Sequence, residues 1–215
     1  MFIKRIPLQR FIVGAALAAL LAGPAIAAEA GTWGVRIRAT YLSLADKSDA
    51  FSALGINFAA NAVEVESKMI PEVDISYWFT PNLSTEIVLT VPQKHEVTLQ
   101  GVGSLGTFKH LPPHFMAVYH FAPDAAFQPY VGAGVNLTLI SSVKLKVANV
   151  GLDLEDSSFG VSAQAGFDYN LGNGKFLNVD VKKTSLRSDV LAGGARLTTA
   201  KLDPWIVSVG FGWRF

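Results

Sequence analysis

Acid–base or metal chemistry in this chain would fall to its four histidines, which are His95, His110, His114 and His120. His110 and His114 are four residues apart, a spacing that brings metal ligands together on a helix, but Pro112 and Pro113 between them exclude a helix. No serine lies two residues from a histidine, as it would in lipid-modifying barrel enzymes, and no aspartate adjoins one. The sequence therefore predicts no enzyme, no metal site and no cofactor.

Charged side chains recur at every second position of otherwise apolar segments. Arg36 and Arg38 alternate with apolar residues between Trp33 and Tyr41, and a similar run follows Leu177. A period of two is typical of β-strands, which send successive side chains to opposite faces. Charges of both signs therefore share one face of a sheet, where we expect ion pairs, because an unpaired buried charge is costly.

The start of the chain is typical of a cleavable export signal. Three basic residues lie within the first ten, 11–21 is a short apolar run, and Ala25-Ile26-Ala27 offers small residues where a signal peptidase cuts. The apolar run is shorter than the roughly 20 residues that a membrane-spanning helix needs. We therefore predict a signal peptide over 1–27 and one domain over 28–215.

The composition of the remaining chain indicates a membrane barrel. Without the signal, 15 of the 18 Lys and Arg residues remain against 17 Asp and Glu, so the charge balance does not predict nucleic-acid binding. Cysteine is absent, and disulfides cannot stabilise the fold. Mean hydropathy is +0.34, yet no later apolar run is long enough for a spanning helix. Since only helices and closed barrels satisfy backbone polar groups in lipid, these observations predict a β-barrel.

Eight segments alternate apolar and polar residues, and most approach the length of a tilted strand that crosses a bilayer. They are 33–41, 73–79, 85–91, 115–121, 131–139, 159–169, 177–182 and 205–215. Their connections are alternately long, roughly 43–68, 93–109, 141–156 and 187–201, and short, 80–82, 122–126 and 170–174. Outer-membrane barrels have this asymmetry of short periplasmic turns and longer outer loops. We therefore predict an all-β fold, an eight-stranded antiparallel up-and-down barrel in the outer membrane with both termini periplasmic.

Aromatic residues support a membrane location. They lie mostly near the ends of the predicted strands on the apolar face, where interfacial girdles belong. The chain ends with Phe211-Gly-Trp213-Arg-Phe215, which is similar to the C-terminal assembly signal of outer-membrane proteins. We therefore expect Phe211, Trp213 and Phe215 to be recognised by the barrel-assembly machinery.

Three sequence blocks resemble the OmpW family of small outer-membrane barrels. They are His110-Leu-Pro-Pro-His-Phe-Met-Ala117, Phe127-Gln-Pro-Tyr-Val-Gly-Ala-Gly-Val-Asn136, and Leu202-Asp-Pro-Trp205 with the terminal Trp213-Arg-Phe215. The resemblance runs through the whole mature chain and is weakest over 43–68. It implies an eight-stranded barrel with a narrow, largely hydrophobic interior. It also implies a role in passing small hydrophobic molecules across the outer membrane.

A barrel of eight strands is barely wide enough for the side chains inside it. The candidate lumen-lining residues are Arg36, Arg38, Asp74, Glu86, Gly132, Gly134, Ser162, Asp168, Asp180, Lys182, Ser208 and Arg214. The small residues among them either line a tunnel or relieve crowding in a tight barrel. The charged residues are expected to pair and to block the periplasmic half of the lumen, leaving no open water pore.

A hydrophobic passenger would then have to leave the barrel sideways. Pro112 and Pro113 remove two backbone donors where the fourth strand begins, and Pro71 has the same effect in the second. These prolines either weaken the ladder enough for lateral exit or only shape a junction between loop and strand. The apolar residues of 43–68 either form a funnel wall or short helix at the outer mouth or pack on the loop itself. The mouth candidates are Phe51, Leu54 and Phe58.

The sequence as a whole predicts a monomeric barrel that facilitates passage of small hydrophobic molecules through a narrow lumen, with lateral release into the bilayer. Its expected partners are outer-membrane lipid, these solutes and the assembly machinery. Two alternatives remain. One is a structural or stress-linked barrel with a plugged lumen that acts through its loops, and the other is a lipid-modifying enzyme.

Overall fold

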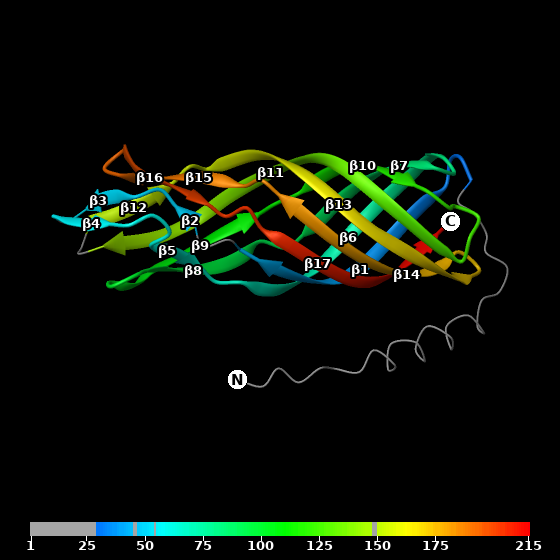
Figure 1. Ribbon diagram of the computed structural model, residues 1–215, viewed down its shortest axis with the longest axis horizontal. Coiled ribbons are helices and arrows are strands. Elements are labelled where there is room, and N and C mark those ends of the chain that lie inside the picture. The colour runs from blue at the N-terminus through cyan, green and yellow to red at the C-terminus, as the bar shows by residue number, and fades with distance from the viewer. Residues whose placement is uncertain (1–28, 45–46, 54, 148–149) are drawn as a thin grey trace, which may run out of the picture.

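The protein forms a closed eight-stranded antiparallel barrel (Figure 1). The computed structural model describes residues 29–44, 47–53, 55–147 and 150–215, so the predicted signal peptide lies outside the described residues. In this part of the chain no helix is long and apolar enough to span a membrane. The barrel strands are β1 (Trp33–Ser43), β6 (Lys68–Thr80), β7 (Leu83–Thr90), β10 (His114–His120), β11 (Phe127–Val147), β13 (Ser157–Gly172), β14 (Lys175–Thr184) and β17 (Trp205–Arg214).

Each barrel strand pairs with the barrel strands that precede and follow it in the chain. The last pair joins β1 to β17, with Gly34 opposite Arg214 and Ser43 opposite Trp205. Beyond the end of β17, Trp33 and Phe215 exchange both backbone hydrogen bonds, each 2.9 Å long. The up-and-down topology is therefore as predicted, and closure leaves the barrel without an edge strand.

Side chains of the barrel strands alternate between the lumen and the outer surface. In β1, Arg36 and Arg38 are buried in the lumen, whereas Ile37 between them is 54% exposed on the outside. The same alternation places Asp180 and Lys182 inside and Val181 outside in β14. An apolar exterior around a polar interior is stable because the acyl chains of a bilayer take the place of water.

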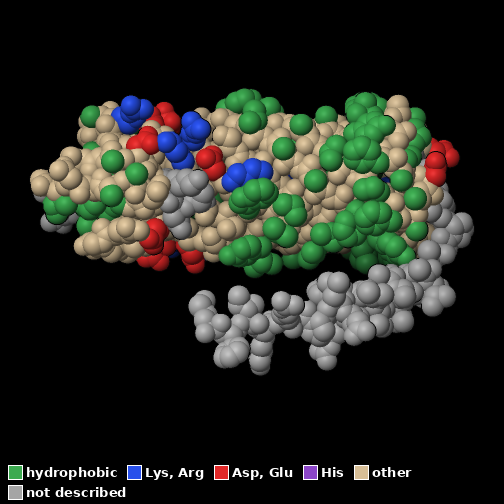
Figure 2. All heavy atoms as spheres, viewed as in Figure 1, with side chains coloured by type: hydrophobic (Ala, Val, Ile, Leu, Met, Phe, Trp, Pro, Cys, Tyr) green, Lys and Arg blue, Asp and Glu red, His purple; other side chains and the backbone are tan. Residues whose placement is uncertain are grey.

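The outer surface has separate apolar and charged zones (Figure 2). We call the end of the barrel with Trp33 and Phe215 the terminal end, and the opposite end the loop end. Exposed aromatic rings gather at the terminal end, where Tyr77 lies with its ring centroid 5.0 Å from those of both Trp33 and Phe79. Charged side chains gather at the loop end, on the left of Figure 2. This zoning is typical of an interfacial girdle below a water-exposed cap.

The predicted long loops are not irregular, which corrects the sequence interpretation. They form short strands that continue the barrel wall at the loop end as an extension, left in Figure 1. The extension contains β2 (Lys47–Ser48), β3 (Phe51–Ala53), β4 (Ile56–Phe58), β5 (Val63–Val65), β8 (Gln93–Leu99), β9 (Gly103–Leu111), β12 (Val150–Leu154), β15 (Arg187–Ala192) and β16 (Ala195–Lys201). The segment 43–68 therefore contains strands where it is described, rather than the short helix that was one alternative.

The extension exists because the alternating pattern continues past the predicted strand ends. In β8, His95, Val97 and Leu99 all point inward, and β9 pairs with both β8 and the prolonged β11. Gly193 and Gly194 have positive φ values of 59° and 83° and form the turn between β15 and β16, a hairpin signal visible in the sequence. The predicted short connections are confirmed, with turns at 81–82, 121–126 and 173–174 between the barrel strands.

Glycines in the lumen wall accommodate large rings from neighbouring strands. A Cβ atom on Gly34 would lie 2.6 Å from the ring of Trp78, and one on Gly212 would collide with the ring of Phe176. Gly134 has no room because the carbonyl oxygen of Phe115 lies directly beside it. At Gly34 and Gly212 the absence of a side chain therefore relieves crowding by a neighbouring ring.

The fit between Gly212 and Phe176 makes a testable prediction. Replacing Gly212 with Ala forces the buried Phe176 ring to move within a packed lumen, which should lower the free energy of unfolding by about 1–3 kcal/mol. Urea titration followed by the folded band on unheated gels measures this change. Gly151→Ala in β12 is the control, because nothing lies within 4 Å of its added Cβ. Equal midpoints for the two variants would contradict the prediction.

Candidate functional site

The lumen of the terminal half is filled by paired charges. Arg36 binds Glu86 and also lies 3.2 Å from the Oδ2 atom of Asp168. Arg38 reaches both Glu72 and Asp74, at 2.7 Å each. These side chains are buried and come from four different barrel strands. The resulting network, together with Arg214, Asp180 and Lys182, is called the plug below.

Neutral groups and aromatic rings complete the plug. The Tyr130 hydroxyl donates to Asp180 at 2.9 Å, and Asn178 Nδ2 donates to Asp168 Oδ1 at 2.8 Å. At the terminal end, the Arg214 guanidinium lies 4.5 Å from the ring centre of Phe176 and 5.0 Å from that of Trp78. These contacts supply hydrogen bonds to the buried ion pairs, although Lys182 Nζ keeps no partner among the described residues. A straight passage through the terminal half would have to break them.

Every predicted lumen-lining residue lies on the inner face of the barrel. The charged residues and Ser162 and Ser208 are buried or nearly so, and Gly132 and Gly134 lie on the same face of β11. The structure brings Arg36, Asp168 and Arg214 into one cluster, since Arg214 Nη2 lies 2.7 Å from Asp168 Oδ2. Ser208 and Ser162 lie outside this cluster and bond instead to Thr40 and Thr184, each at 2.9 Å.

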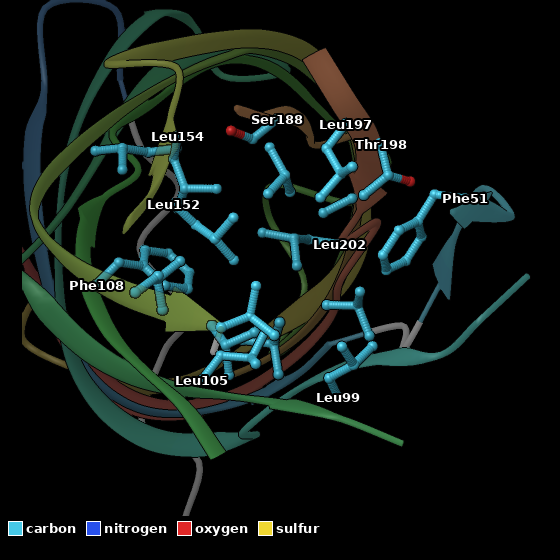
Figure 3. Close-up of a pocket in the computed structure, with 18 residues that line it drawn as sticks. Phe51, Leu99, Leu105, Phe108, Leu152, Leu154, Ser188, Leu197, Thr198 and Leu202 are labelled. Carbon is cyan, nitrogen blue, oxygen red and sulfur yellow. The ribbon is translucent and has the colours of Figure 1, made fainter. Parts of the chain in front are cut away.

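The loop half of the lumen is different, because an apolar cavity replaces the plug (Figure 3). Its walls come from β3, β5, β8, β9, β11, β12, β15 and β16, and only Ser188 and Thr198 bring polar side chains. The cavity volume is about 40 Å³, so the apolar side chains nearly meet across the axis. The hydrophobic interior that the family resemblance implied therefore holds only for the loop half.

Two of the three residues predicted to lie at the outer mouth, Phe51 and Phe58, are described by the structure. Phe51 lines the cavity, and Phe58 is buried with its ring stacked on Phe51 at 5.0 Å between centroids. Leu54 lies outside the described residues. Sequence reasoning missed most of the wall, such as Val97, Leu99 and Leu145, although a period of two in 93–99 and 143–147 would have indicated it.

The prolines lie where the barrel wall is interrupted. Pro112 and Pro113 separate β9 from β10, and on the neighbouring strand Val91 and Pro92 separate β7 from β8. The ladder between these strands ends at Val88 opposite His114 and resumes at Gln93 opposite His110. On one side of this break lie four residues, 89–92, and on the other side lie three, 111–113. We call this break the proline gap.

From the sequence, Pro71 is expected to weaken the strand ladder as well, but Pro71 lies outside the proline gap. It lies within β6, exposed on the outside and opposite Ala39 in an uninterrupted pairing with β1. Its carbonyl oxygen accepts a hydrogen bond of 2.7 Å from Thr90 Oγ1. The expectation that Pro71 weakens the ladder is therefore wrong for the β1 side of this strand, since the ladder continues through it.

The C-terminal residues form part of the lipid-facing girdle. Trp213 and Phe215 are exposed on the outer surface, and the ring of Phe211 packs on Trp213 at 4.6 Å between centroids. Their exposure agrees with recognition by another protein during assembly, which stays a prediction.

Comparison with known proteins identifies the family. The OmpW family matches residues 29–215, which is the whole described barrel. The chain belongs to the OmpW family. Outer membrane protein W of Vibrio cholerae is 34% identical over 214 residues, which cover 94% of this chain and 96% of that protein.

Two further similarities bear on fold and function. The crystal structure of the outer membrane protein OprG from Pseudomonas aeruginosa matches with a TM-score of 0.76 and 25% identity, covering 88% of this chain and 98% of that one. The dibenzothiophene metabolism operon protein PahQ of Pseudomonas aeruginosa is 25% identical over 198 residues, 87% of this chain and 90% of that protein. The protein is therefore an outer-membrane β-barrel of the OmpW type, embedded in the membrane by its eight strands.

The plug predicts a strong dependence of stability on Asp168. Asp168→Asn removes the negative charge between Arg36 and Arg214. Arg36 keeps Glu86, but Arg214 loses its ion-pair partner while it stays buried, which should cost about 3 kcal/mol of unfolding free energy. Urea unfolding in detergent measures the loss. Asp124→Asn, in the exposed turn at the same end of the barrel, should leave the midpoint unchanged. A wild-type midpoint for Asp168→Asn would show that the plug is not held by this charge.

Proposed function

We propose that this OmpW-family barrel passes small hydrophobic molecules through its outer half and releases them sideways into the bilayer at the proline gap. In this proposal the loop end faces outward and the terminal end faces the periplasm. The observation that carries it is the division of one lumen into an apolar cavity and a charged plug.

The plug argues against a straight path. A hydrophobic guest moving along the axis would have to separate Arg36 from Asp168 and Arg38 from Asp74, all buried. Separating a buried ion pair without replacing its partner costs several kcal/mol, and an apolar molecule offers no replacement. The guest is therefore stopped at the boundary between cavity and plug.

The cavity supports entry from the loop end. Its side chains present a continuous apolar surface to a molecule that water does not solvate well. The cavity is nearly filled at rest, so a guest must spread the short strands of the extension. In this proposal β3 and β4 move apart from the rest of the extension, because they are three residues long and form a sheet of their own.

The proline gap supports exit to the side. Ile140 lines the cavity and lies opposite His110 in the β9–β11 ladder, and Leu111 then begins the gap. Pro112 and Pro113 have no backbone N–H to donate across it. The cavity floor and the gap are thus neighbours, so a guest would leave the cavity where the strand ladder is interrupted.

A second interruption of the wall is less suited to exit. The β13–β14 ladder ends at Ser162 opposite Thr184, where the outer surface is hollowed. Inside this hollow, Thr184 Oγ1 bonds to Ser162 Oγ at 2.9 Å and to His114 Nε2 at 3.1 Å, which closes it with polar groups. None of these residues lines the apolar cavity.

The relatives agree with an apolar cargo. The name of PahQ associates that protein with an operon for the metabolism of dibenzothiophene, a fused aromatic molecule without charge. This supports hydrophobic passage and leaves the cargo of the present protein to experiment.

Filling the cavity should stop transport. Ala200 is buried in the cavity wall, and Ala200→Phe places a ring in a space with little room to spare. Uptake of a labelled apolar solute such as naphthalene by cells that produce this variant should fall by roughly an order of magnitude. Ala133→Phe on the outer face of β11 is the matched control and should transport like wild type. If wild-type protein itself gives no uptake above empty cells, the barrel acts by another route, such as its loops.

Locking the proline gap should stop release. The chain has no cysteine, so Val91→Cys with Leu111→Cys introduces one thiol pair across the gap. Oxidation should reduce uptake of the same solute, and reduction should restore it. Val135→Cys with Val161→Cys, opposite each other in the continuous β11–β13 ladder, should have no effect in either state. Equal uptake by the oxidised and reduced gap variant would refute lateral exit there.

A further inference from the structure

We propose that His95 and His110 form a binding site at the floor of the cavity for the uncharged, hydrogen-bonding end of an amphiphilic guest, such as an aliphatic alcohol. This inference rests on the proposed function and narrows it. The guest would lie with its apolar body in the cavity and its polar end against the two imidazole rings.

The register of the strands places both histidines level with the cavity floor. His95 in β8 lies opposite Phe108, and His110 in β9 lies opposite Ile140. Phe108 and Ile140 both line the cavity. The imidazole rings are 4.6 Å apart between centroids, and both also pack near the Phe108 ring. Along β8 and β9, moving from the cavity toward the terminal end, they are therefore the first inward-facing polar side chains.

Both rings have unused hydrogen-bonding capacity. His95 Nδ1 bonds to the backbone oxygen of Glu66 at 2.7 Å, but His95 Nε2 and His110 Nδ1 are buried without a partner in the described part of the chain. The two side chains are 0% and 2% exposed. Leaving a buried polar atom unpaired is costly, so a polar guest group that bonded to these nitrogens would recover that cost.

The surroundings keep both imidazoles uncharged. Burial lowers the pKa of His110 to about 3, and the neighbouring His95 and His114 act in the same direction. Burial also lowers the pKa of His95, with Lys68 adding to the effect and the Glu66 backbone and side chain opposing it. Below them, His114 bonds to Thr184, and the charged groups of the plug come after that. Because the Glu66 oxygen only accepts, His95 Nδ1 carries the proton and the free His95 Nε2 is an acceptor, whereas His110 Nδ1 is a donor or an acceptor according to its tautomer. Neither ring carries a positive charge.

This chemistry selects among possible guests. A neutral imidazole pairs well with a hydroxyl, which both donates and accepts, whereas it gives a carboxylate no counter-charge in an apolar setting. A pure alkane would leave the ring nitrogens unpaired. A metal ion is a poor occupant, because no group of three His, Cys, Asp or Glu side chains in the described residues is placed to hold one.

The experiment compares octanol with octane in cells that produce the full chain. His95→Phe with His110→Phe keeps two planar rings and removes the ring nitrogens, so uptake of octanol relative to octane should fall several-fold while octane uptake persists. His110→Gln, which keeps hydrogen-bonding groups, should retain the wild-type ratio. Phe108→Leu, a change of shape alone in the same layer, should alter both solutes equally.

The outcomes separate the two proposals. If the octanol-to-octane ratio is the same in wild type and in the double phenylalanine variant, or if uptake of both solutes falls equally, the histidine site is wrong and hydrophobic passage stands. If wild-type protein transports neither solute, the proposed function itself fails. Should the double variant not reach the folded band on unheated gels, His110→Phe alone decides by the same ratio.

Discussion

Closure of the backbone hydrogen-bond ladder is the constraint on which the rest of this structure depends. In hydrocarbon no water can bond to a free peptide group, so β1 must pair with β17, down to the exchange between Trp33 and Phe215. Closure with only eight strands makes the lumen about as wide as the side chains that fill it. Each inward residue therefore meets residues from across the barrel, and Gly34 and Gly212 leave room for the rings of Trp78 and Phe176.

Within this narrow lumen, polarity changes in layers along the barrel axis. Paired charges occupy the terminal half, neutral histidines follow, and apolar side chains occupy the loop half. Each layer is stable for its own reason: the charges because they are paired, the apolar side chains because they pack together. Within the described residues, the histidine layer has neither ion pairs nor purely apolar packing, and His95 and His110 keep unpaired nitrogens, as Lys182 does in the plug. The proline gap lies beside this same layer, so the two unusual features of the barrel occur at one level.

Sequence reasoning succeeded where the pattern is local and repeated. The alternation of Arg36, Ile37 and Arg38 is enough to predict a strand with a polar inner face, and eight such segments with alternating loop lengths predict the barrel. It failed where strands are short or where the ladder shifts. β11 was predicted to end near Leu139, yet it continues to Val147 through a register shift between Ser141 and Lys144. The three-residue strands in 43–68 are too short to show a period; β3 and β4 pair with each other, and β5 pairs with β8 of the extension.

The sequence by itself determined the barrel, its apolar exterior, the set of inward residues and the family, because a period of two assigns each side chain to a face whatever the partner strand. Only the tertiary structure decided which inward residues meet. Arg36, Asp168 and Arg214 come together because β1, β13 and β17 are brought to the same height by strand register, and no spacing along the chain encodes that height. The same is true of the apolar cavity, whose walls come from eight strands that are far apart in the sequence and from Leu202. Distance across a barrel depends on closure, and closure is a property of all eight strands together.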